Sequence, residues 1–419
     1  MKTPITIKSG KNNISSLIAL FICLAFSLNT LGQQVNSTLI ETWSIDNWEN
    51  FMLVTNTYSD SRLTNTLSQN WITATSSWKN TSQSNYTYNS NGDINQIIIQ
   101  SWNTNSSVWS NSQRITFSYN SSNKVLSTII EIWMISNWQN TSKTINTYDE
   151  SDYLTNSISQ TWISFSSTWQ NSTQTLYANN PNGTLSVETL ELWDNATMGW
   201  TKNQKQTYSY DSAKNVLTEL KQMWADGTST WENTSKETYT YNSANKVLTD
   251  IYEIWMGANW GNTTKDTNTY DSSGYLTYHL SQNWLMLSDL WENSDQSFYT
   301  NNAEGYPTQI VTQNWDSDLS NWNNAQRMSF NYTPLSISDY TITNDFHAYP
   351  NPVSENITIK SNNSISGLPY CITDQIGRTI KIGTLNTNET NIDMTPLNSG
   401  IYFIKIGQPE KQTLKIVKK

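Results

Sequence analysis

Residues 216–241 read VLTELKQMWADGTSTWENTSKETYTY, and this stretch contains every recurring feature of the central part of the chain. Trp224 and Trp231 lie at its centre. Gln222 stands two residues before the first tryptophan, Asn233 two after the second, and Tyr241 ten after it. Residues an even number of positions apart share one face of a β-strand, whereas a helix would scatter them. The stretch therefore predicts a two-stranded hairpin in which the tryptophans face each other across the turn.

The same arrangement recurs along the chain. The step from a second tryptophan to the next first one is 24 residues eight times and 23 once, while either four or six residues separate the two members of a pair. A fixed long step with a variable short gap indicates a repeat array whose units are joined by adjustable loops. All twenty tryptophans belong to these ten pairs: Trp43/Trp48, Trp71/Trp78, Trp102/Trp109, Trp133/Trp138, Trp162/Trp169, Trp193/Trp200, Trp224/Trp231, Trp255/Trp260, Trp284/Trp291 and Trp315/Trp322.

Other positions recur at even offsets from the tryptophans. Glu or Gln stands two before the first tryptophan in ten repeats, and Asn stands two after the second in nine. Tyr stands ten after the second in eight repeats, and aliphatic residues stand four and eight before the first in nine each. We therefore expect all these side chains on one concealed face, with Thr, Ser, Asn, Lys and Gln on a face that meets water. Because one repeat cannot bury its own face, the array should fold as a cooperative stack with weak ends.

The segments between repeats have the composition of turns. Clusters such as Asn89–Gly92 and Asp271–Gly274 follow the tyrosines; Asn and Asp bond their own backbone there, and Gly accepts positive φ. The predicted fold is all-β: a long antiparallel meander of about ten two-stranded repeats, forming a coiled or spiral sheet over residues 33–332.

Segments such as Tyr239-Thr-Tyr-Asn-Ser-Ala-Asn-Lys-Val-Leu248 resemble the YD repeats of RHS-type proteins, over residues ~35–333. The central Asp of that motif is often Asn here, and its Arg is missing. The resemblance implies a long coiled sheet rather than a propeller.

The first 32 residues have the features of a secretory signal peptide. Lys2, Lys8 and Lys11 form a charged start, and an apolar run from Ile14 to Leu28 follows. The run is short of the ~20 residues that a membrane span needs, so we expect a removable signal and no membrane span after its removal. The mature chain then contains one cysteine, Cys371, and can form no internal disulfide.

Charge narrows the choice of partners. Residues 33–344 carry 13 basic and 28 acidic side chains, a net charge of −15. Because so acidic a surface repels phosphate backbones, nucleic acid is excluded as a partner, and anionic lipid is disfavoured.

A different composition begins after a linker at residues 333–345. The motifs of residues 346–419 resemble the type A C-terminal sorting domain of type IX secretion substrates; they are Tyr349-Pro350-Asn351-Pro352, Gly377, Gly400 and Lys418-Lys419. The resemblance implies a small Ig-like β-sandwich that the type IX translocon and its sorting protease recognise. It also implies a protein secreted by, or held on the outer surface of, a Gram-negative bacterium.

Two functions of the repeat array are compatible with its composition. The first is a structural or adhesive role at the cell surface, in which regularity itself is the function. The second is binding of an extracellular glycan or surface polymer, because indole rings stack on sugar C–H faces while amides bond hydroxyl groups. The alternative for the same residues is an internal hydrogen-bonded ladder of Glu/Gln and Asn in a buried core. The candidate ligand-binding residues are Trp71, Trp78, Trp102, Trp109, Trp162, Trp169, Trp224, Trp231, Gln69, Gln100, Asn80 and Asn111.

Catalysis has little support in the sequence. The chain has two histidines and no triad spacing or phosphate-binding glycine loop. Paired carboxylates leave a glycoside hydrolase as a remote alternative. Glu41, Glu131, Glu191 and Glu253, however, recur at one repeat position, as scaffold residues do. We expect no enzyme, cofactor or metal site; the one metal alternative is weak calcium binding at Asp316–Asp318 and at the Asp/Asn turns.

Overall fold

The computed structural model describes residues 33–334, 346–361, 367–374, 379–406 and 412–419, and it divides into two compact units, Met1–Pro334 and Leu335–Lys419. The proposed signal peptide and residues 335–345 of the proposed linker lie outside the described residues. The described parts are almost entirely β-structure. The elements of the first unit are β1 (Gln33–Ser44), β2 (Asn47–Ser59), β3 (Arg62–Ile72), the 3-10 turn η1 (Thr73–Thr75), β4 (Ser77–Tyr88), β5 (Ile94–Asn103), β6 (Val108–Tyr119), β7 (Val125–Met134), β8 (Asn137–Tyr148), β9 (Leu154–Ile163), β10 (Thr168–Asn179), β11 (Leu185–Asp194), β12 (Gly199–Tyr210), β13 (Val216–Ala225), β14 (Thr230–Tyr241), β15 (Val247–Trp255), β16 (Trp260–Tyr270), β17 (Leu276–Leu285), β18 (Leu290–Asn301), β19 (Pro307–Asp316) and β20 (Asn321–Pro334).

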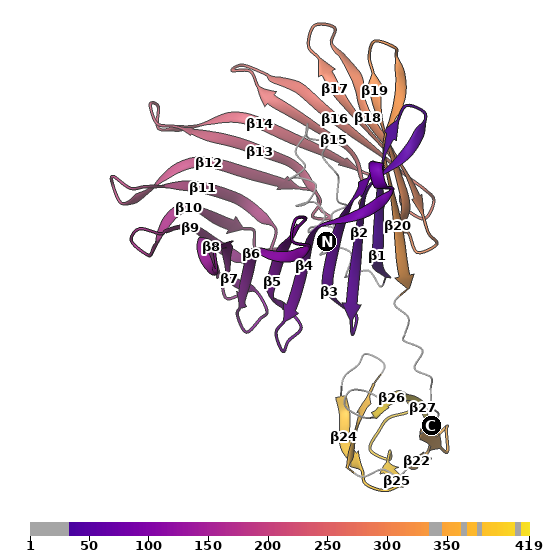
Figure 1. The fold of residues 1–419 in the computed structure, drawn as a ribbon. Coiled ribbons are helices and arrows are strands. Elements are labelled where there is room, and N and C mark those ends of the chain that lie inside the picture. Colours follow the sequence, from indigo (N-terminus) through magenta and orange to yellow (C-terminus); the bar gives the residue numbers. More distant parts are fainter. Residues whose placement is uncertain (1–32, 335–345, 362–366, 375–378, 407–411) are drawn as a thin grey trace. The chain divides into compact units, whose positions relative to one another are not determined.

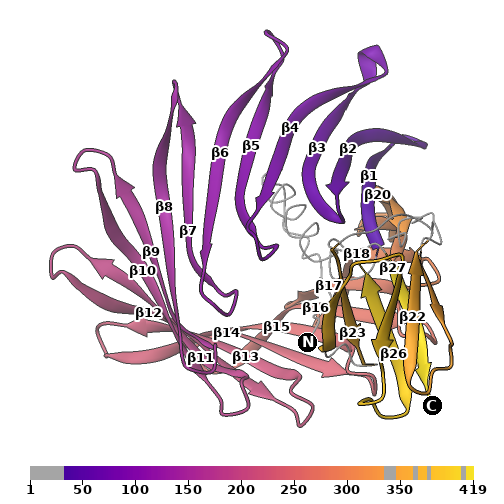
Figure 2. The same ribbon diagram turned by 90° about the horizontal axis from the view of Figure 1, so that it is seen from below.

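These twenty strands form one closed antiparallel sheet (Figures 1 and 2). Each strand pairs with its neighbours in sequence, and β1 pairs with both β2 and β20. The all-β meander of two-stranded repeats is thus confirmed. The expected weak ends are wrong, because the first and last strands pair with each other and leave the sheet no free edge.

The seam between β1 and β20 uses the same register as the interfaces inside the array. Glu41 of β1 lies opposite Arg327 of β20, just as Glu131 of β7 lies opposite Arg114 of β6. The closing interface is therefore one more copy of the interface between consecutive repeats, which is why a linear repeat can close on itself.

A β-bulge divides the second strand of every repeat. In the β5–β6 hairpin, Gln100 lies opposite Asn111 but Ile99 lies opposite Gln113, so Ser112 is an extra residue. A further bulge lies beside the tyrosine turn: Thr87 lies opposite Gln96 but Tyr88 lies opposite Ile94, so Asn95 is an extra residue. Each extra residue reverses which face the following side chains occupy.

The prediction of one shared face is therefore wrong. The tryptophans, the Glu or Gln two before them and the Asn two after them share one face, here called the Trp face. The Tyr ten positions after the second tryptophan and the aliphatic residue eight positions before the first lie on the opposite face, here called the Tyr face. The pairing of Tyr88 with Ile94 is an example. In the described part of this unit, two apolar clusters lie on the Tyr face: Ile40, Met52, Val54, Ile310 and Met328 near the seam, and Leu63, Tyr86 and Ile97 on β3–β5.

The recurring tyrosines form hydrogen bonds beside these bulges. In every repeat, the side chain ten after the second tryptophan donates to the backbone carbonyl of the residue eight before the first, at 2.5–3.0 Å. Tyr88 Oη, for example, donates to the Leu63 carbonyl at 2.6 Å. Asn179 and Asn301 make the same bond where Tyr is absent. The predicted turns are confirmed too: Asn89 Oδ1 accepts the amides of Asn91 and Asp93, and Gly92 has φ +93°.

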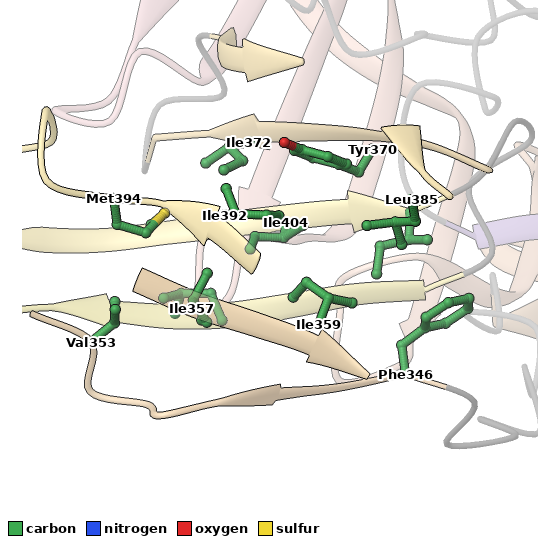
Figure 3. Close-up of a cluster of buried hydrophobic side chains, with 12 residues drawn as sticks. Phe346, Val353, Ile357, Ile359, Tyr370, Ile372, Leu385, Ile392, Met394 and Ile404 are labelled. Carbon is green, nitrogen blue, oxygen red and sulfur yellow. The ribbon is translucent and has the colours of Figure 1, made fainter. Parts of the chain in front are cut away.

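The described part of the second unit forms two small antiparallel sheets. They are β21 (Phe346–Tyr349), β22 (Asn356–Ser361) and β25 (Glu389–Asp393) in one, and β23 (Leu368–Thr373), β24 (Thr379–Leu385), β26 (Gly400–Ile406) and β27 (Gln412–Lys418) in the other. Alternate aliphatic residues, among them Ile357, Ile359, Ile372 and Ile404, are fully buried in one shared core (Figure 3). This unit therefore has a hydrophobic core of its own.

Candidate functional site: the tryptophan rim

The tryptophan pairs face each other as the sequence predicts. All ten pairs are register partners or direct neighbours across the hairpin, and their ring centroids lie 4.9–5.1 Å apart at 62–72°, an edge-to-face arrangement. All twenty indoles are half-buried. The expected concealment of the tryptophans is therefore incomplete: the Trp face presents part of each pair to solvent.

The predicted hydrogen-bonded ladder is present on this face. Gln69 Nε2 donates to Asn80 Oδ1 and Gln100 Nε2 to Asn111 Oδ1, each at 2.9 Å. The same bond forms in every other repeat that has Gln at this position: Gln160–Asn171, Gln222–Asn233, Gln282–Asn293 and Gln313–Asn324. The candidate amides of the sequence analysis are thus engaged with each other, two residues along the strands from the half-buried tryptophans.

The position five after the second tryptophan was missed. Because of the bulge it lies on the Trp face, opposite the Glu or Gln of the next repeat. Arg114 binds Glu131 through two hydrogen bonds of 2.5 and 2.6 Å, Arg327 binds Glu41 through two of 2.6 Å, and Lys236 lies 2.7 Å from Glu253. Long polar side chains occupy this position in nine repeats, Leu53 being the exception, and that regularity was the available signal.

Most of these cations also stack on tryptophan. Arg114 lies 4.9 Å from the ring centroid of Trp138, and Arg327 lies 4.9 Å from that of Trp48. Lys205, Lys236 and Lys265 stack in the same way on Trp231, Trp260 and Trp291, and Lys202 lies 4.3 Å from the Trp224 ring centroid. Where a cation stacks on a tryptophan in this way, that indole face is already occupied.

The four recurring glutamates are held within this ladder. Glu41 and Glu131 bind arginines, Glu253 binds Lys236, and Glu191 accepts a hydrogen bond of 2.5 Å from Gln174. Asp316, the first residue of the calcium alternative, uses Oδ1 to accept the amides of Asp318 and Leu319. Among the described residues, no group of three or more His, Cys, Asp or Glu side chains is placed to hold a metal ion.

The Tyr face carries its own polar network on β11–β18. Tyr239 Oη donates toward two carboxylates, Glu237 at 2.8 Å and Glu219 at 3.2 Å, and burial followed by these and nearby negative charges strongly raises the pKa of Tyr239. The buried His279 places Nδ1 3.0 Å from Asn268 Oδ1. These groups bind one another and keep a polar sector of the face satisfied.

The ten hairpin tips between paired tryptophans all lie at one end of the closed sheet, because the strands form a meander. Eight of these tips expose large apolar side chains, and four of them are almost fully exposed: Ile45 at 90%, Ile135 at 100%, Phe165 at 102% and Leu287 at 105%. The tips contain six aspartates and no lysine or arginine. We call the tips and the tryptophan pairs behind them the tryptophan rim.

Between two neighbouring hairpins the rim is hollowed into a groove of about 440 Å³. Trp169 and Gln170 of β10 line one side, and Trp193, Asn195 and Met198 of the β11–β12 hairpin line the other. Of the candidate residues, this groove contains Trp169; the others named in the sequence analysis are distributed along the sheet.

The structure brings the described sorting residues together at the end of the second unit. Asn351 donates through Nδ2 to the Lys415 carbonyl and accepts through Oδ1 from the Val417 amide, at 2.7 and 2.8 Å. Gly400 lies opposite Lys418, and the Lys419 amide donates to the Val353 carbonyl. Gly377 lies outside the described residues. The Tyr349–Pro352 motif and the C-terminal lysines thus form one structural element.

Comparisons with solved structures give distant likenesses. A porin-like protein from Bacteroides uniformis is 12% identical at a TM-score of 0.30, covering 71% of this chain and 98% of that one. The Photorhabdus luminescens Tc holotoxin pore is 10% identical at 0.26, covering 91% and 24%. PorZ, a surface component of the type IX secretion system of Porphyromonas gingivalis, is 8% identical at 0.16, covering 91% and 86%. At these TM-scores none of them supports a conclusion about this chain.

No curated protein matches the chain. Among the described residues, no helix has the length and apolar character to cross a membrane. The family described as a secretion system C-terminal sorting domain matches residues 347–419, the part in which the sorting motifs converge. The C-terminal unit is therefore a type IX secretion sorting domain, which marks the protein for secretion or for attachment at the outer cell surface.

Proposed function

We propose that the exported protein is a structural and adhesive component of the cell surface and that the tryptophan rim is its contact surface. The observation that carries this proposal is the exposure of apolar side chains at eight hairpin tips on one end of one closed sheet. Exposed apolar residues that gather in one place mark interaction sites, whereas scattered ones need no explanation.

The closed sheet suits such a role mechanically. The ladder holds every tip at a fixed position relative to its neighbours, so little freedom is lost when many tips contact one surface together. The acidic array and the absence of cations from the tips keep the rim from binding nucleic acid or anionic lipid. The recurring glutamates serve as scaffold residues, and we propose no catalytic role for them.

The second unit has the supporting features of the Ig-like sandwich that the sorting-domain resemblance implies, since two sheets share one core. Its role is delivery of the array through contacts with the type IX translocon and its sorting protease.

Adsorption to octyl-coated beads tests the adhesive function. Replacing Ile45, Phe165 and Leu287 together by Ser removes three exposed apolar side chains, each worth about 1.5–3 kcal/mol on full burial. Because 1.4 kcal/mol is tenfold in affinity, adsorption should weaken by at least about 100-fold. Leu126, Leu176 and Leu217, which are 37–40% exposed away from the tips, provide the matched control triple variant. Unchanged adsorption of the tip variant, or an equal loss in the control variant at equal thermal stability, refutes the proposal.

The carbohydrate-binding function is favoured at one place, the groove between the β9–β10 and β11–β12 hairpins, where amides and half-exposed indoles meet in a hollow.

A further inference from the structure

We propose that this groove binds an uncharged pyranose unit of an extracellular glycan. The inference deepens the adhesive function, on which it rests, by assigning a ligand class to one part of the rim. The groove lies within the size range of small-ligand sites, and it combines apolar walls with a few polar groups, as such sites do.

The indoles of this groove are open to a ligand. In the described part of the chain, no lysine or arginine stacks on Trp169 or Trp193, whereas six other tryptophans are covered by cations. Lys143 occupies the position that would cover Trp169 but does not stack on it. Two uncovered rings, one from each hairpin, therefore offer flat apolar surface to the C–H face of a sugar.

The polar groups at the groove suit hydroxyl ligands. Gln170 Nε2 donates to Asn195 Oδ1, so an amide pair joins the two hairpins. This bond leaves Gln170 Oε1 as an acceptor and Asn195 Nδ2 as a donor, and among the described residues neither atom makes another hydrogen bond. Neighbouring hydroxyls of a pyranose can each donate and accept, so they match an adjacent donor and acceptor.

The groove selects against charged ligands. None of its lining residues is charged. Asp194, adjacent to Asn195, accepts hydrogen bonds from the Thr197 hydroxyl and the Ala196 amide of its own turn, and these bonds lower the pKa of its carboxyl. None of the residues that line the groove is a cation that could pair with a uronic or sulfated sugar, and Asp194 beside it would repel one, so we infer a neutral ligand.

Titration of the purified full-length protein with soluble hexasaccharides of glucose, mannose, galactose and N-acetylglucosamine, and of galacturonate, tests the inference. At least one neutral hexasaccharide should bind, with saturable change in tryptophan fluorescence. Trp169→Ala and Gln170→Ala should each weaken that binding at least tenfold. Trp231→Ala, at the equivalent position but covered by Lys205, should leave it unchanged.

The inference is overturned if no neutral hexasaccharide binds, if galacturonate binds more tightly, or if Trp231→Ala weakens binding as much as Trp169→Ala. Gln170→Ala keeps the test valid where an indole deletion unfolds the hairpin. Adsorption to octyl beads separates this inference from the adhesive function: Gln170→Ala should retain it, and the tip triple variant should lose it. Loss of sugar binding alone therefore reports on the groove, and loss of adsorption alone reports on the rim.

Discussion

Replacing Arg327 by Leu tests whether the seam between β1 and β20 is the place where the closed sheet opens first. Arg327 makes two hydrogen bonds of 2.6 Å to Glu41, whose side chain is 10% exposed, and it stacks on Trp48. Its removal leaves a nearly buried carboxylate without its cation. Loss of such a charged pair should cost about 3 kcal/mol.

The array contains a matched control for this change. Arg114 binds Glu131 with equivalent geometry, exposure and stacking on Trp138, but its strand is joined to its partner by a short turn. The two seam residues are 286 positions apart, against 17 in the control pair. Bringing the two ends of the 286-residue segment back together costs about 2.5 kcal/mol more than for the 17-residue segment. The reason is that the entropy cost of closing a loop of n residues grows as ~1.5RT ln n.

Hydrogen exchange measured strand by strand distinguishes the two variants. Arg327→Leu and Arg114→Leu should lower the denaturant midpoint to a similar extent. In Arg327→Leu, however, β1 and β20 should exchange about 70-fold faster than the rest of the array, the factor that 2.5 kcal/mol represents. In Arg114→Leu, β6 and β7 should exchange at the rate of their neighbours. Equal local acceleration in both variants, or none at β1 and β20, would refute the seam as the point of opening.

Two further predictions concern pH and export. Burial raises the pKa of Tyr299 and Tyr332 to about 12 each, so the folded array holds these protons more tightly than the unfolded chain, in which tyrosine titrates near ~10. The stability that these two tyrosines contribute should be constant below about pH 10 and should be lost as the pH rises from about 10 to about 12; denaturant midpoints measured across that range check this, and Tyr332→Phe should flatten the decline. Deletion of residues 345–419 should leave the protein in the periplasm, and its detection at the cell surface by protease accessibility would contradict the sorting role.

Much of the array could be read from the sequence because its hairpins are local. The tryptophan lattice fixed the turn positions, and the Gln–Asn spacing predicted a ladder that the structure contains, as between Gln100 and Asn111. These features depend only on residues close in sequence and on the two-residue period of a strand.

The bulges could not be read in this way. The extra residue is Ser112 in one repeat and Thr81 or Phe51 in others, so no glycine or proline marks it. Tyr119 stands at an even number of residues from Trp109, which predicts that both lie on one face. The bulge between them does not alter this number, but it places Tyr119 on the opposite face. Parity counted along a strand is reliable only where no residue is inserted into the pairing.

Closure of the sheet was not predicted either, although the sequence contains the pair of residues that joins its two ends. Glu41 in the first repeat needs the cation that an earlier repeat supplies elsewhere, and the described part of the chain before it contains none. Arg327 in the last repeat occupies the position that supplies it. The need of Glu41 for a cation can be recognised only once the bulge is known to place Arg327 on the Trp face. The unpredicted bulge therefore explains why closure was not predicted either.

The one irregular step in the lattice is compatible with closure. Between Tyr58 and Leu63 the turn has one residue fewer than between Tyr88 and Ile94, and this produces the single step of 23. Asp60 and Ser61 both adopt positive φ there, and Ser59 pairs with Arg62, which are the features of a two-residue hairpin turn. The pairing of Tyr58 with Leu63 and the Tyr58 hydrogen bond to Val35 are retained. A residue can thus be lost from a turn without moving the ladder, whereas a change within the strands would displace every later repeat and separate Arg327 from Glu41.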